Sequence, residues 1–528
     1  MERNRIGAMT FLAGLLLLMS PRPSADAVAT AARRYCAAHQ SEILRDFAEL
    51  LAIPNVASDT AGIGRNVEAI RDRLVRRGLT ARLLDGAGGP PLVFATLEAP
   101  GATRTLLIYA HYDGQPVDAA QWAGSPWTPL LRDKPLEAGG APLALDPLPG
   151  PAQPEWRLYA RSAGDDKAPI VGVLTALDAL RQARLPLSLN LKLLFEGEEE
   201  AGSPHLAAAL ATHSDLLGAD LLLLCDGPVH QSRRMQVVFG ARGVTDVELT
   251  VYGPLRALHS GHYGNWAPNP AVLLAHIVAD LRDPDGQILI PGFYDDVRPV
   301  TAAEQAALER FPDPDAELRD SLALAATEAG NARLAERVLL PALNVRGLLA
   351  GGVGVAAANA IPTEARASID FRLVPNQTPG RVRELFEAAL RRQGFFLVET
   401  TPDAETRRLH SRVVQLHWGA GYPAARTPLD LPVARRLVDV IEEGLGGPVV
   451  VAPTLGGSIP MYLFKDLLGA PVVGFPIVNH DNNQHASNEN LRLRNLWDGI
   501  EAYAAVFARL GPALGAAELA DKGSPARP

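Results

Sequence analysis

Three aliphatic runs in this chain each end in a side chain that can bind a metal ion. The runs are TLLIYAHYD (105–113), LKLLFEGEEE (191–200) and LLLLCD (221–226). Runs of this kind, bounded by polar turns, are typical of strands buried on both faces of a parallel sheet. In such sheets, chemistry gathers beyond the carboxyl ends of the strands. We therefore expect one site at that edge, built from His111, Asp113, Glu199, Glu200 and Asp226.

Two further segments supply residues of the same kind, Asp165 in ARSAGDDKA (160–168) and His485 in NQHASNE (483–489). Two imidazoles among several carboxylates suit a pair of divalent ions in a hydrolase. Of two adjacent glutamates, one could bind metal while the other takes a proton from water. On its own, the glutamate cluster could instead be a solvated acidic turn at a helix N-terminus.

The overall composition narrows the class of partner. At 528 residues the chain is long enough for two domains. Its net charge of -9 gives no basic footprint for nucleic acid and no attraction to anionic lipid. Small molecules or peptides are therefore the expected partners. The two cysteines, Cys36 and Cys225, are too few for a disulfide framework.

The N-terminus has the pattern of a secretory signal. Two arginines precede an apolar stretch at residues 8–19, and an Ala25-Asp26-Ala27 site follows. The stretch is about a dozen residues, short of the roughly 20 that span a bilayer. We expect residues 1–27 to be a signal peptide, with an uncleaved anchor as the alternative. The mature protein would then be exported, periplasmic or secreted, and not bound to the membrane.

The hydrophobic pattern divides the rest of the chain. Residues 28–241 alternate strand-like and helical segments, which predicts a doubly wound α/β domain with a mostly parallel central sheet. Segments 244–252 and 365–374 show period-two alternation, typical of an antiparallel sheet. We expect an inserted α+β domain at 242–420, a return to the first domain at 421–515, and a flexible tail at 516–528.

From about residue 40 to 510, the chain resembles the di-zinc metallopeptidase family of carnosinases, bacterial dipeptidases, aminoacylases and succinyl-diaminopimelate desuccinylases. The carnosinase-like dipeptidase branch is the most similar. The motifs that carry the resemblance are HYDGQPVD (111–118), YARSAGDDKAP (159–169), FEGEEEAGS (195–203), LLCDGP (223–228), LHSGHYG (258–264), NAIP (359–362), DFRLVP (370–375), GGSIP (456–460) and QHASNE (484–489).

The resemblance implies two Zn²⁺ ions per subunit, with Mn²⁺ or Co²⁺ as alternatives. His111, Asp165 and Asp226 would hold one ion, and Asp165, Glu200 and His485 the other. Glu199 would be the general base, and Asp113 would orient His111. The peptide bond after Asp165 is expected to be cis.

It also implies that the first domain is catalytic and that the inserted one is a lid and dimerisation domain. His259 would reach the partner subunit's site in a homodimer and stabilise the tetrahedral oxyanion, unless it is a plain polar loop residue. Asn359, Gly457 and Ser458 match substrate-binding positions. Arg372 could clamp a substrate carboxylate, or be a strand arginine paired on the sheet surface. His262 and His417 are left unassigned.

The chain departs from the family's pattern at two places. Ser162 and Ala168 stand where relatives usually have glycine around the bridging aspartate, and Thr454-Leu455 stands where carnosinase-like enzymes have Arg-Glu. The second change removes a charged pair close to the substrate pocket. It leaves the identity of the substrate open.

Aspartate at position 226 favours the dipeptidase and aminopeptidase type within the resembling family. The resemblance therefore implies hydrolysis of dipeptides or short peptides, in which Glu199 activates a water that bridges the two metals. An N-acyl amino acid deacylase is the nearest alternative. A non-catalytic peptide-binding protein that keeps the same fold is a remote one.

Overall fold

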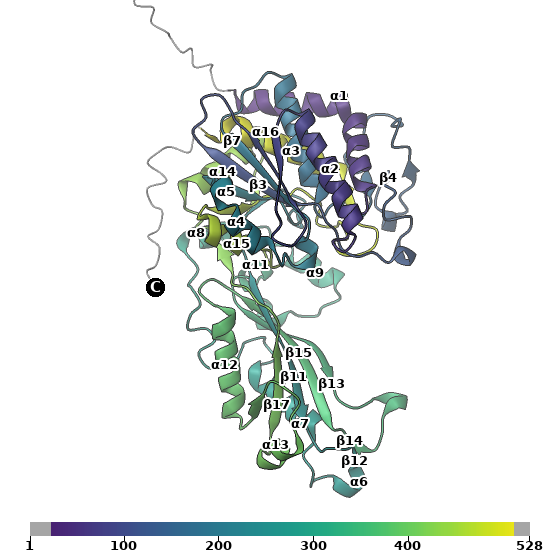
Figure 1. The fold of residues 1–528 in the computed structure, drawn as a ribbon, viewed down its shortest axis with the longest axis vertical. Helices are drawn as coiled ribbons and strands as arrows, with labels where there is room; N and C mark the ends of the chain where they lie inside the picture. The colour runs from purple at the N-terminus through teal and green to yellow at the C-terminus, as the bar shows by residue number, and fades with distance from the viewer. Residues whose placement is uncertain (1–22, 512–528) are drawn as a thin grey trace, which may run out of the picture.

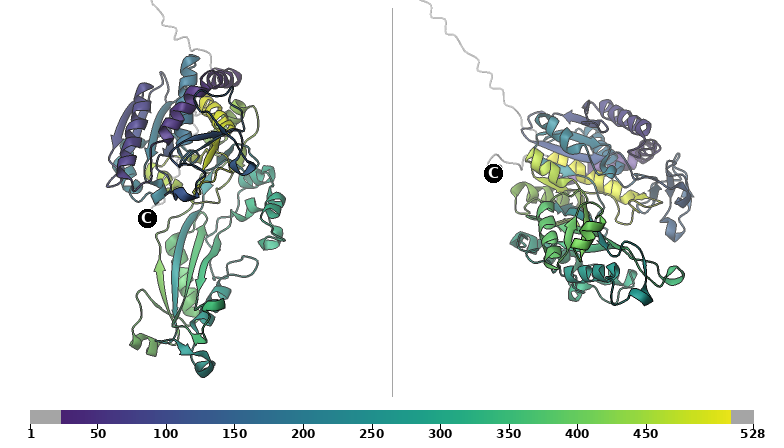
Figure 2. Two further views of the ribbon diagram at one scale, coloured as in Figure 1. Left: turned by 90° about the vertical axis from the view of Figure 1, so that its right-hand side faces the viewer. Right: turned by 60° about the horizontal axis from the view of Figure 1, so that its bottom comes forward.

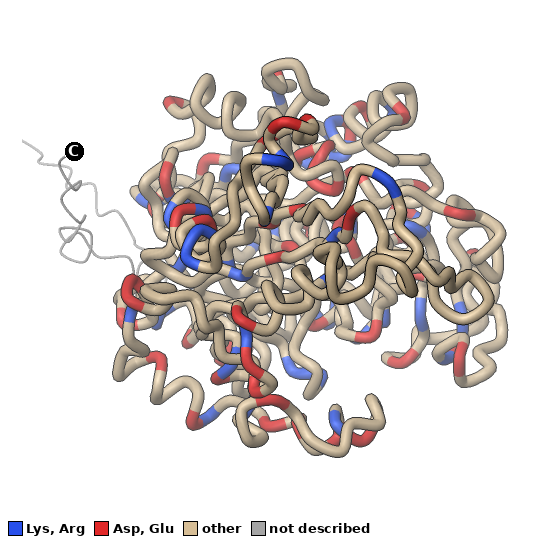
Figure 3. Tube along the Cα trace, turned by 90° about the horizontal axis from the view of Figure 1, so that it is seen from below, with Lys and Arg blue, Asp and Glu red and all other residues tan. Residues whose placement is uncertain are grey.

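The computed structural model describes residues 23–511. Residues 1–22 of the predicted signal peptide and the predicted tail at 516–528 lie outside them. Within residues 23–511 the chain forms a large domain and an elongated inserted domain that extends away from it (Figure 1). No helix in that range has the length and apolarity to cross a bilayer. Seen from below, acidic and basic residues are interspersed along the chain (Figure 3).

The large domain is built on an eight-stranded sheet of order β1-β2-β7-β3-β8-β20-β9-β19. The three predicted strands form its centre, where β3 (Thr105–His111) lies parallel to both β7 (Asn190–Glu196) and β8 (Leu221–Leu224). Strand β20 (Val472–Gly474) continues the parallel part beside β8. The outer strands are β1 (Thr80–Leu84), β2 (Leu92–Leu97), β9 (Gln236–Val238) and β19 (Val450–Ala452). The sheet is therefore mixed but mostly parallel at its centre, as predicted.

Helices cover both faces of this sheet, which confirms the doubly wound arrangement. One face carries α1 (Ala25–Leu51), α2 (Thr60–Arg76), α3 (Lys167–Gln182), α14 (Pro432–Leu445) and α16 (Leu493–Arg509). The other carries α4 (Leu206–Thr212), α5 (Ser214–Leu217) and α15 (Met461–Leu468). Alternate residues of β3 enter the two cores, Ile108 on one side and Tyr109 on the other. The predicted cleavage point near Ala27 falls in the first turn of α1, before its first buried residue, Val28.

A small four-stranded sheet of order β21-β6-β4-β5 joins segments that are distant in sequence. Its strands are β4 (Leu130–Arg132), β5 (Pro142–Leu143), β6 (Arg157–Tyr159) and β21 (Asn490–Arg492). Strand β6 pairs antiparallel with β21, so that Tyr159 lies opposite Asn490. This pairing brings the segment that precedes Asp165 beside the segment that follows His485.

The inserted domain has a five-stranded sheet of order β13-β15-β11-β17-β16. Its strands are β11 (Gly243–Tyr252), β13 (Ala342–Leu349), β15 (Glu364–Leu373), β16 (Phe396–Val398) and β17 (Val413–Trp418). Strand β11 pairs antiparallel with both β15 and β17. Helices α7 (Pro270–Leu281) and α12 (Pro379–Arg392) share a core with these strands. The predicted α+β domain with an antiparallel sheet is therefore present.

One part of the 242–420 range packs outside this domain. Helix α8 (Ala302–Arg310) contacts β19, and Ala307 belongs to the core of the large domain. The helix is anchored there by Glu304, which pairs with Arg298 at 2.5 Å and with Arg426 at 3.1 Å. Helices α9 (Asp315–Ser321) and α11 (Leu334–Arg337) follow near the junction of the two domains (Figures 1 and 2).

Candidate active site

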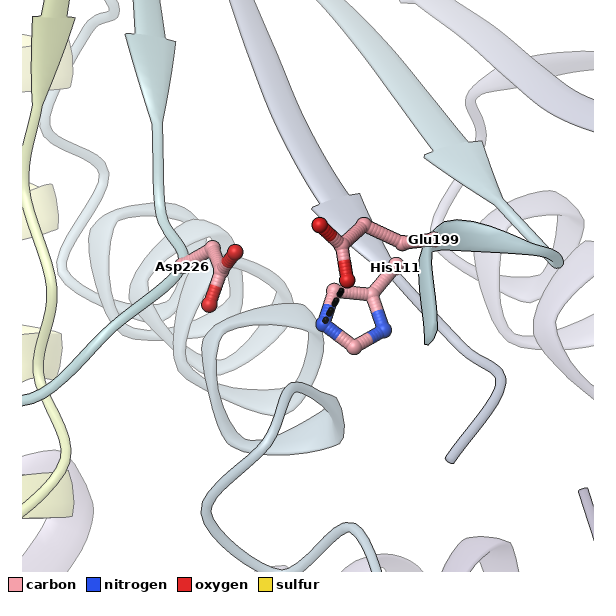
Figure 4. A group of neighbouring side chains, drawn as sticks. All are labelled: His111, Glu199 and Asp226. Atoms are coloured by element: carbon pink, nitrogen blue, oxygen red, sulfur yellow. Dashed lines mark ion pairs between the residues drawn. The ribbon is translucent and has the colours of Figure 1, made fainter. Parts of the chain in front are cut away.

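Metal-binding side chains converge at the carboxyl edge of the central strands. His111 is the last residue of β3 and lies in register with Glu196, the last residue of β7. Glu199 begins the short turn after β7, and Asp226 follows β8. Figure 4 shows His111, Glu199 and Asp226 facing one another beyond the strand ends. Their potential ligand atoms all lie within 4.8 Å of one another.

A second cluster adjoins the first and consists of Asp165, Glu200 and His485. The Asp165 carboxylate contacts both clusters, with Oδ1 2.9 Å from His111 Nε2 and Oδ2 3.1 Å from His485 Nε2. His485 Nε2 is also 3.3 Å from Glu200 Oε2. Asp165 thus lies where a residue that bridges two cations would have to lie.

Asp113 contacts both His111 and the backbone of the turn that carries Glu199 and Glu200. Its Oδ1 lies 3.3 Å from His111 Nδ1. Its two oxygens also accept hydrogen bonds from the backbone N–H groups of Glu199 and Glu200, at 3.1 and 3.0 Å. Because Asp113 is fully buried, these contacts are shielded from water. One carboxylate therefore orients the imidazole and holds the turn that presents both glutamates.

The loop that carries Asp165 is held by Glu489, a residue for which sequence reasoning gave no role. The buried Glu489 carboxylate accepts hydrogen bonds from Arg161 Nη1 at 2.8 Å, Ser162 N at 3.0 Å, and Gly164 N and Asp165 N at 2.8 Å each. Ser162 has a φ of 61°, a left-handed conformation that explains why glycine suits this position. The Asp165–Asp166 peptide bond is cis, as expected.

Two glutamines that were also missed donate hydrogen bonds to the cluster. Gln115 Nε2 lies 2.7 Å from Glu200 Oε2, and Gln484 Nε2 lies 2.7 Å from Asp165 Oδ2. Both glutamines belong to motifs that carry the family resemblance, HYDGQPVD and QHASNE. Their position within these motifs is the only feature of the sequence that points to the site, because an amide is a weaker indicator of metal binding than a carboxylate.

Burial and crowding disturb the protonation of the cluster. Burial, and then the charge of Asp165, raise the pKa of Glu200 to about 7 and that of Asp226 to about 6. Burial and the charge of Asp226 raise the pKa of Glu199 well above its ordinary value. Burial also opposes ionisation of Asp165, but hydrogen bonds from His111 and His485 outweigh it and lower the pKa. The pKa shifts of Glu199, Glu200 and Asp226 thus reflect burial first and mutual repulsion of the carboxylates second.

This set of side chains fits two divalent cations. Each cluster offers one imidazole nitrogen and carboxylate oxygens within 4.8 Å of one another, which is the mixed ligand set that Zn²⁺, Mn²⁺ and Co²⁺ accept. Cations there would also relieve the repulsion that raises the pKa values of Glu199, Glu200 and Asp226. Geometry alone groups Glu199 with the first cluster, so its assignment as general base stays a prediction.

Two of the predicted substrate-binding residues meet at the domain junction. Arg372, near the end of β15, donates through Nη1 to Ser458 Oγ at 2.9 Å and through Nε to Asp370 Oδ2 at 3.1 Å. The neighbouring Gly457 carbonyl accepts from Arg242 N at 3.2 Å. Tyr422, also missed, stacks on Tyr462 at 5.0 Å. Burial and the charge of Glu199 raise the pKa of Tyr422 to about 12.

The remaining predicted residues lie elsewhere. His259 ends β12 (Leu258–His259), which pairs with β14 (Ala360–Ile361) beside Asn359 at the far tip of the inserted domain (Figure 1). Asn359 O accepts from Ser260 N at 2.9 Å, and the His259 ring lies 4.5 Å from that of His262. His417 is exposed on β17. The structure therefore does not bring His259 or Asn359 to the metal site of the same chain.

Comparisons with known proteins agree with this geometry. A model of "Peptidase family M20/M25/M40" matches residues 107–509. The chain is 26% identical over 537 residues to beta-Ala-His dipeptidase of Homo sapiens, covering 95% of this chain and 98% of the relative. It is 24% identical to Cys-Gly metallodipeptidase dug1 of Schizosaccharomyces pombe, covering 89% of this chain and 96% of the relative.

Solved structures show the same fold. An M20 family metallo-carboxypeptidase from Sulfolobus solfataricus has a TM-score of 0.72 at 28% identity, covering 89% of this chain and 99% of that chain. Human carnosine dipeptidase 1 has a TM-score of 0.70 at 22% identity, covering 93% and 100%. The family model spans most of the chain and every residue of the two clusters. The chain therefore belongs to peptidase family M20/M25/M40 and is a metal-dependent peptidase.

Proposed function

We propose that this protein is an exported, zinc-dependent dipeptidase that hydrolyses dipeptides or short peptides beside a free amino terminus. The observation that carries the proposal is the Asp165 carboxylate, which contacts the imidazoles of both ligand clusters at 2.9 and 3.1 Å, next to the cluster that contains Glu199. The names of the relatives, a beta-Ala-His dipeptidase and a Cys-Gly metallodipeptidase, support dipeptides as the substrate class. The signal-like N-terminus supports export to the periplasm or medium.

Two Zn²⁺ ions per subunit fit the donor set, with Mn²⁺ or Co²⁺ as alternatives. His111, Asp165 and Asp226 would hold one ion, and Asp165, Glu200 and His485 the other. When bound, such ions supply Lewis acidity, which polarises the scissile carbonyl and makes a water molecule more acidic.

In this proposal Glu199 moves the proton. Its Oε2 lies 4.0 Å from His111 Nε2, so its carboxylate is within the cluster of metal-binding side chains. Glu199 takes the proton from the attacking water and passes it to the leaving amine. Burial raises the pKa of Glu199, which suits a group that must give the proton back. Asp113 keeps the Glu199 backbone in place through its hydrogen bond.

Arg372 is the group proposed to bind the substrate's terminal carboxylate. Asp370 and Ser458 hold its guanidinium in place, and a planar guanidinium can engage a carboxylate through two hydrogen bonds. Gly457 and Ser458 would form the wall beside that carboxylate. The hydrogen bond to Asp370 also fits the alternative role, in which Arg372 is a strand arginine paired on the sheet surface. Substitution of Arg372 separates the two roles, because only the first predicts weaker substrate binding.

The site would be completed by a second subunit. His259 and Asn359 lie together at the tip of the inserted domain, and both are exposed there. We propose a homodimer through this domain, in which His259 reaches the partner's site and stabilises the oxyanion that forms on the scissile carbonyl. Exposure of both residues supports this arrangement, because neither is used by its own chain's metal site.

The test compares two substrate classes with purified, metal-loaded protein. Unblocked dipeptides should be hydrolysed and N-acyl amino acids should not, while Glu199→Ala should lose hydrolysis and keep its metal. Exclusive turnover of the acylated compounds would make the protein a deacylase. Peptide binding by a parent protein that hydrolyses neither class would make it a binding protein.

A further inference from the structure

A pocket of about 290 Å³ lies between the turn that follows β8 and the segment 311–338 of the inserted range. Its walls come from the turn after β8, the chain around α9 and α11, and the loop after β19. The residues that matter for the argument are Pro228, His230, Phe311, Val338, Leu455 and His480. None of the proposed metal ligands or substrate-binding residues lines it.

The pocket adjoins the site through Leu455. A Cβ built on Gly227, the residue after Asp226, would lie 3.9 Å from Leu455 Cδ2. A Cβ built on Gly457 would lie 4.0 Å from the same atom. The Leu455 side chain therefore lies close both to the residue that follows Asp226 and to the residue that precedes Ser458. Val338 packs against the loop that carries Leu455, since its Cγ1 lies 3.5 Å from a Cβ built on Gly456.

The charged residues that line the pocket are already engaged. Arg333 donates to the carbonyls of Leu308 at 3.0 Å and Phe311 at 2.9 Å. Asp315 Oδ2 accepts from Leu334 N at 2.8 Å. These contacts hold both side chains within the covering segment, although each keeps its charge and Arg333 Nε has no hydrogen-bond partner within residues 23–511.

Its two histidines are neutral. Burial lowers the pKa of His230 to about 4 and lowers that of His480 as well. His230 Nδ1 accepts from Ser232 N at 3.0 Å, and its ring meets the Phe311 ring edge-on at 4.9 Å. His480 Nδ1 is buried with no hydrogen-bond partner among the described residues. The pocket therefore combines an apolar wall with neutral imidazoles.

We infer that this pocket receives the side chain of the substrate's C-terminal residue and selects apolar or aromatic side chains there. The inference rests on the proposed dipeptidase function. The C-terminal residue is the relevant one because Ser458, proposed to contact its carboxylate, and Leu455 belong to the same short loop. Most of the lining residues are apolar, and Arg333 and Asp315 are held by hydrogen bonds within the covering segment. Such a lining favours burial of an apolar side chain over a charged one.

Two series of unblocked dipeptides test the assignment on the metal-loaded protein. In the Gly-X series, kcat/KM for Gly-Leu and Gly-Phe should exceed that for Gly-Asp and Gly-Lys by about tenfold or more. Leu455→Asp should collapse the ratio of kcat/KM for Gly-Leu to that for Gly-Lys. Leu467→Asp is the matched control, because Leu467 is 40% exposed on α15, outside the pocket. It should keep the parental ratio.

Val338→Phe provides a second variant that adds no charge. It should narrow the pocket and lower kcat/KM for Gly-Phe relative to Gly-Ala. Circular dichroism and metal content show whether Leu455→Asp folds. If it does not fold, the assignment is tested by the ratio of kcat/KM for Gly-Phe to that for Gly-Ala in Val338→Phe. Equal efficiency across the Gly-X series, or a preference confined to X-Gly substrates, would overturn the pocket assignment. Failure of the parent to cleave any dipeptide would instead overturn the proposed function.

Discussion

The carboxylate of Glu489 should be essential to the site although it does not face the metal clusters. Glu489→Gln tests this with an almost isosteric change. In the parent, one oxygen accepts from Arg161 and Ser162, and the other accepts from Gly164 and Asp165. An amide keeps one acceptor oxygen but turns the other into a donor. Whichever way the glutamine lies, two buried donors lose their acceptor.

The expected cost follows from burial. Glu489 is 0% exposed and Arg161 is 2% exposed, so water cannot replace the lost contacts. Removing one partner of a buried ion pair costs roughly 3–5 kcal/mol, and a buried unsatisfied N–H costs about 1–3 kcal/mol. We expect Glu489→Gln to lose about 3–5 kcal/mol of unfolding free energy. The amide oxygen should turn toward the Arg161 cation, which leaves Gly164 N and Asp165 N without an acceptor. Because the Asp165 backbone is then released, metal affinity should fall about 10- to 100-fold.

Urea unfolding and metal titration measure these two effects. Glu443→Gln is the matched control, since Glu443 pairs with Arg436 at 3.1 Å and with Arg509 on the surface, with 39% of its side chain exposed. An exposed pair contributes about 1 kcal/mol or less, so the control should stay close to the parent. If Glu489→Gln unfolds within about 1 kcal/mol of the parent and binds metal as tightly, the reasoning about this carboxylate is wrong.

Three further outcomes are expected. Glu199→Gln should lower kcat by about 10²- to 10⁴-fold and keep the metal content measured by mass spectrometry. Mixing inactive His259→Ala and Glu199→Ala chains should restore part of the activity, because a mixed dimer has one complete site; no recovery after confirmed subunit exchange would refute the shared site. Burial lowers the pKa of His230 to about 4, so between about pH 6.5 and 4 the unfolded chain holds this proton and the folded chain does not. Stability should therefore fall as the pH drops from about 6.5 to 4, by about 1–2 kcal/mol after allowance for solvent screening of this half-buried ring. His230→Gln should remove that part of the slope in urea unfolding.

The sequence was most informative where local pattern and chemistry coincide. The run that ends in His111 is both a buried strand and a ligand position, so the central sheet and its edge could be predicted together. The alternation in 244–252 and 365–374 likewise predicted β11 and β15, which pair along their whole length. In each case the residues that determine the structure are neighbours in the chain.

What the sequence could not show depends on contacts between distant segments. Glu489 is 324 residues from Asp165, and its partners are mostly backbone N–H groups, which leave no trace in side-chain pattern. Residues 302–310 form a helix inside the predicted inserted range, yet the hydrophobic pattern does not say which domain this helix packs against. The tip position of His259 also follows from the tertiary fold, because β12 pairs with β14 about a hundred residues later.

Arg372 ties the two domains together at the proposed substrate site. It belongs to β15 of the inserted domain, whereas Ser458, which accepts its hydrogen bond, belongs to a loop of the large domain. The nearby Arg242 adds a second tie, since it donates to the carbonyls of both Gly457 and Leu340. A substrate carboxylate at Arg372 would therefore compete with a contact that helps to fix the angle between the domains. Substrate binding and domain orientation should be energetically coupled for this reason, with the coupling centred on the loop that also carries Leu455.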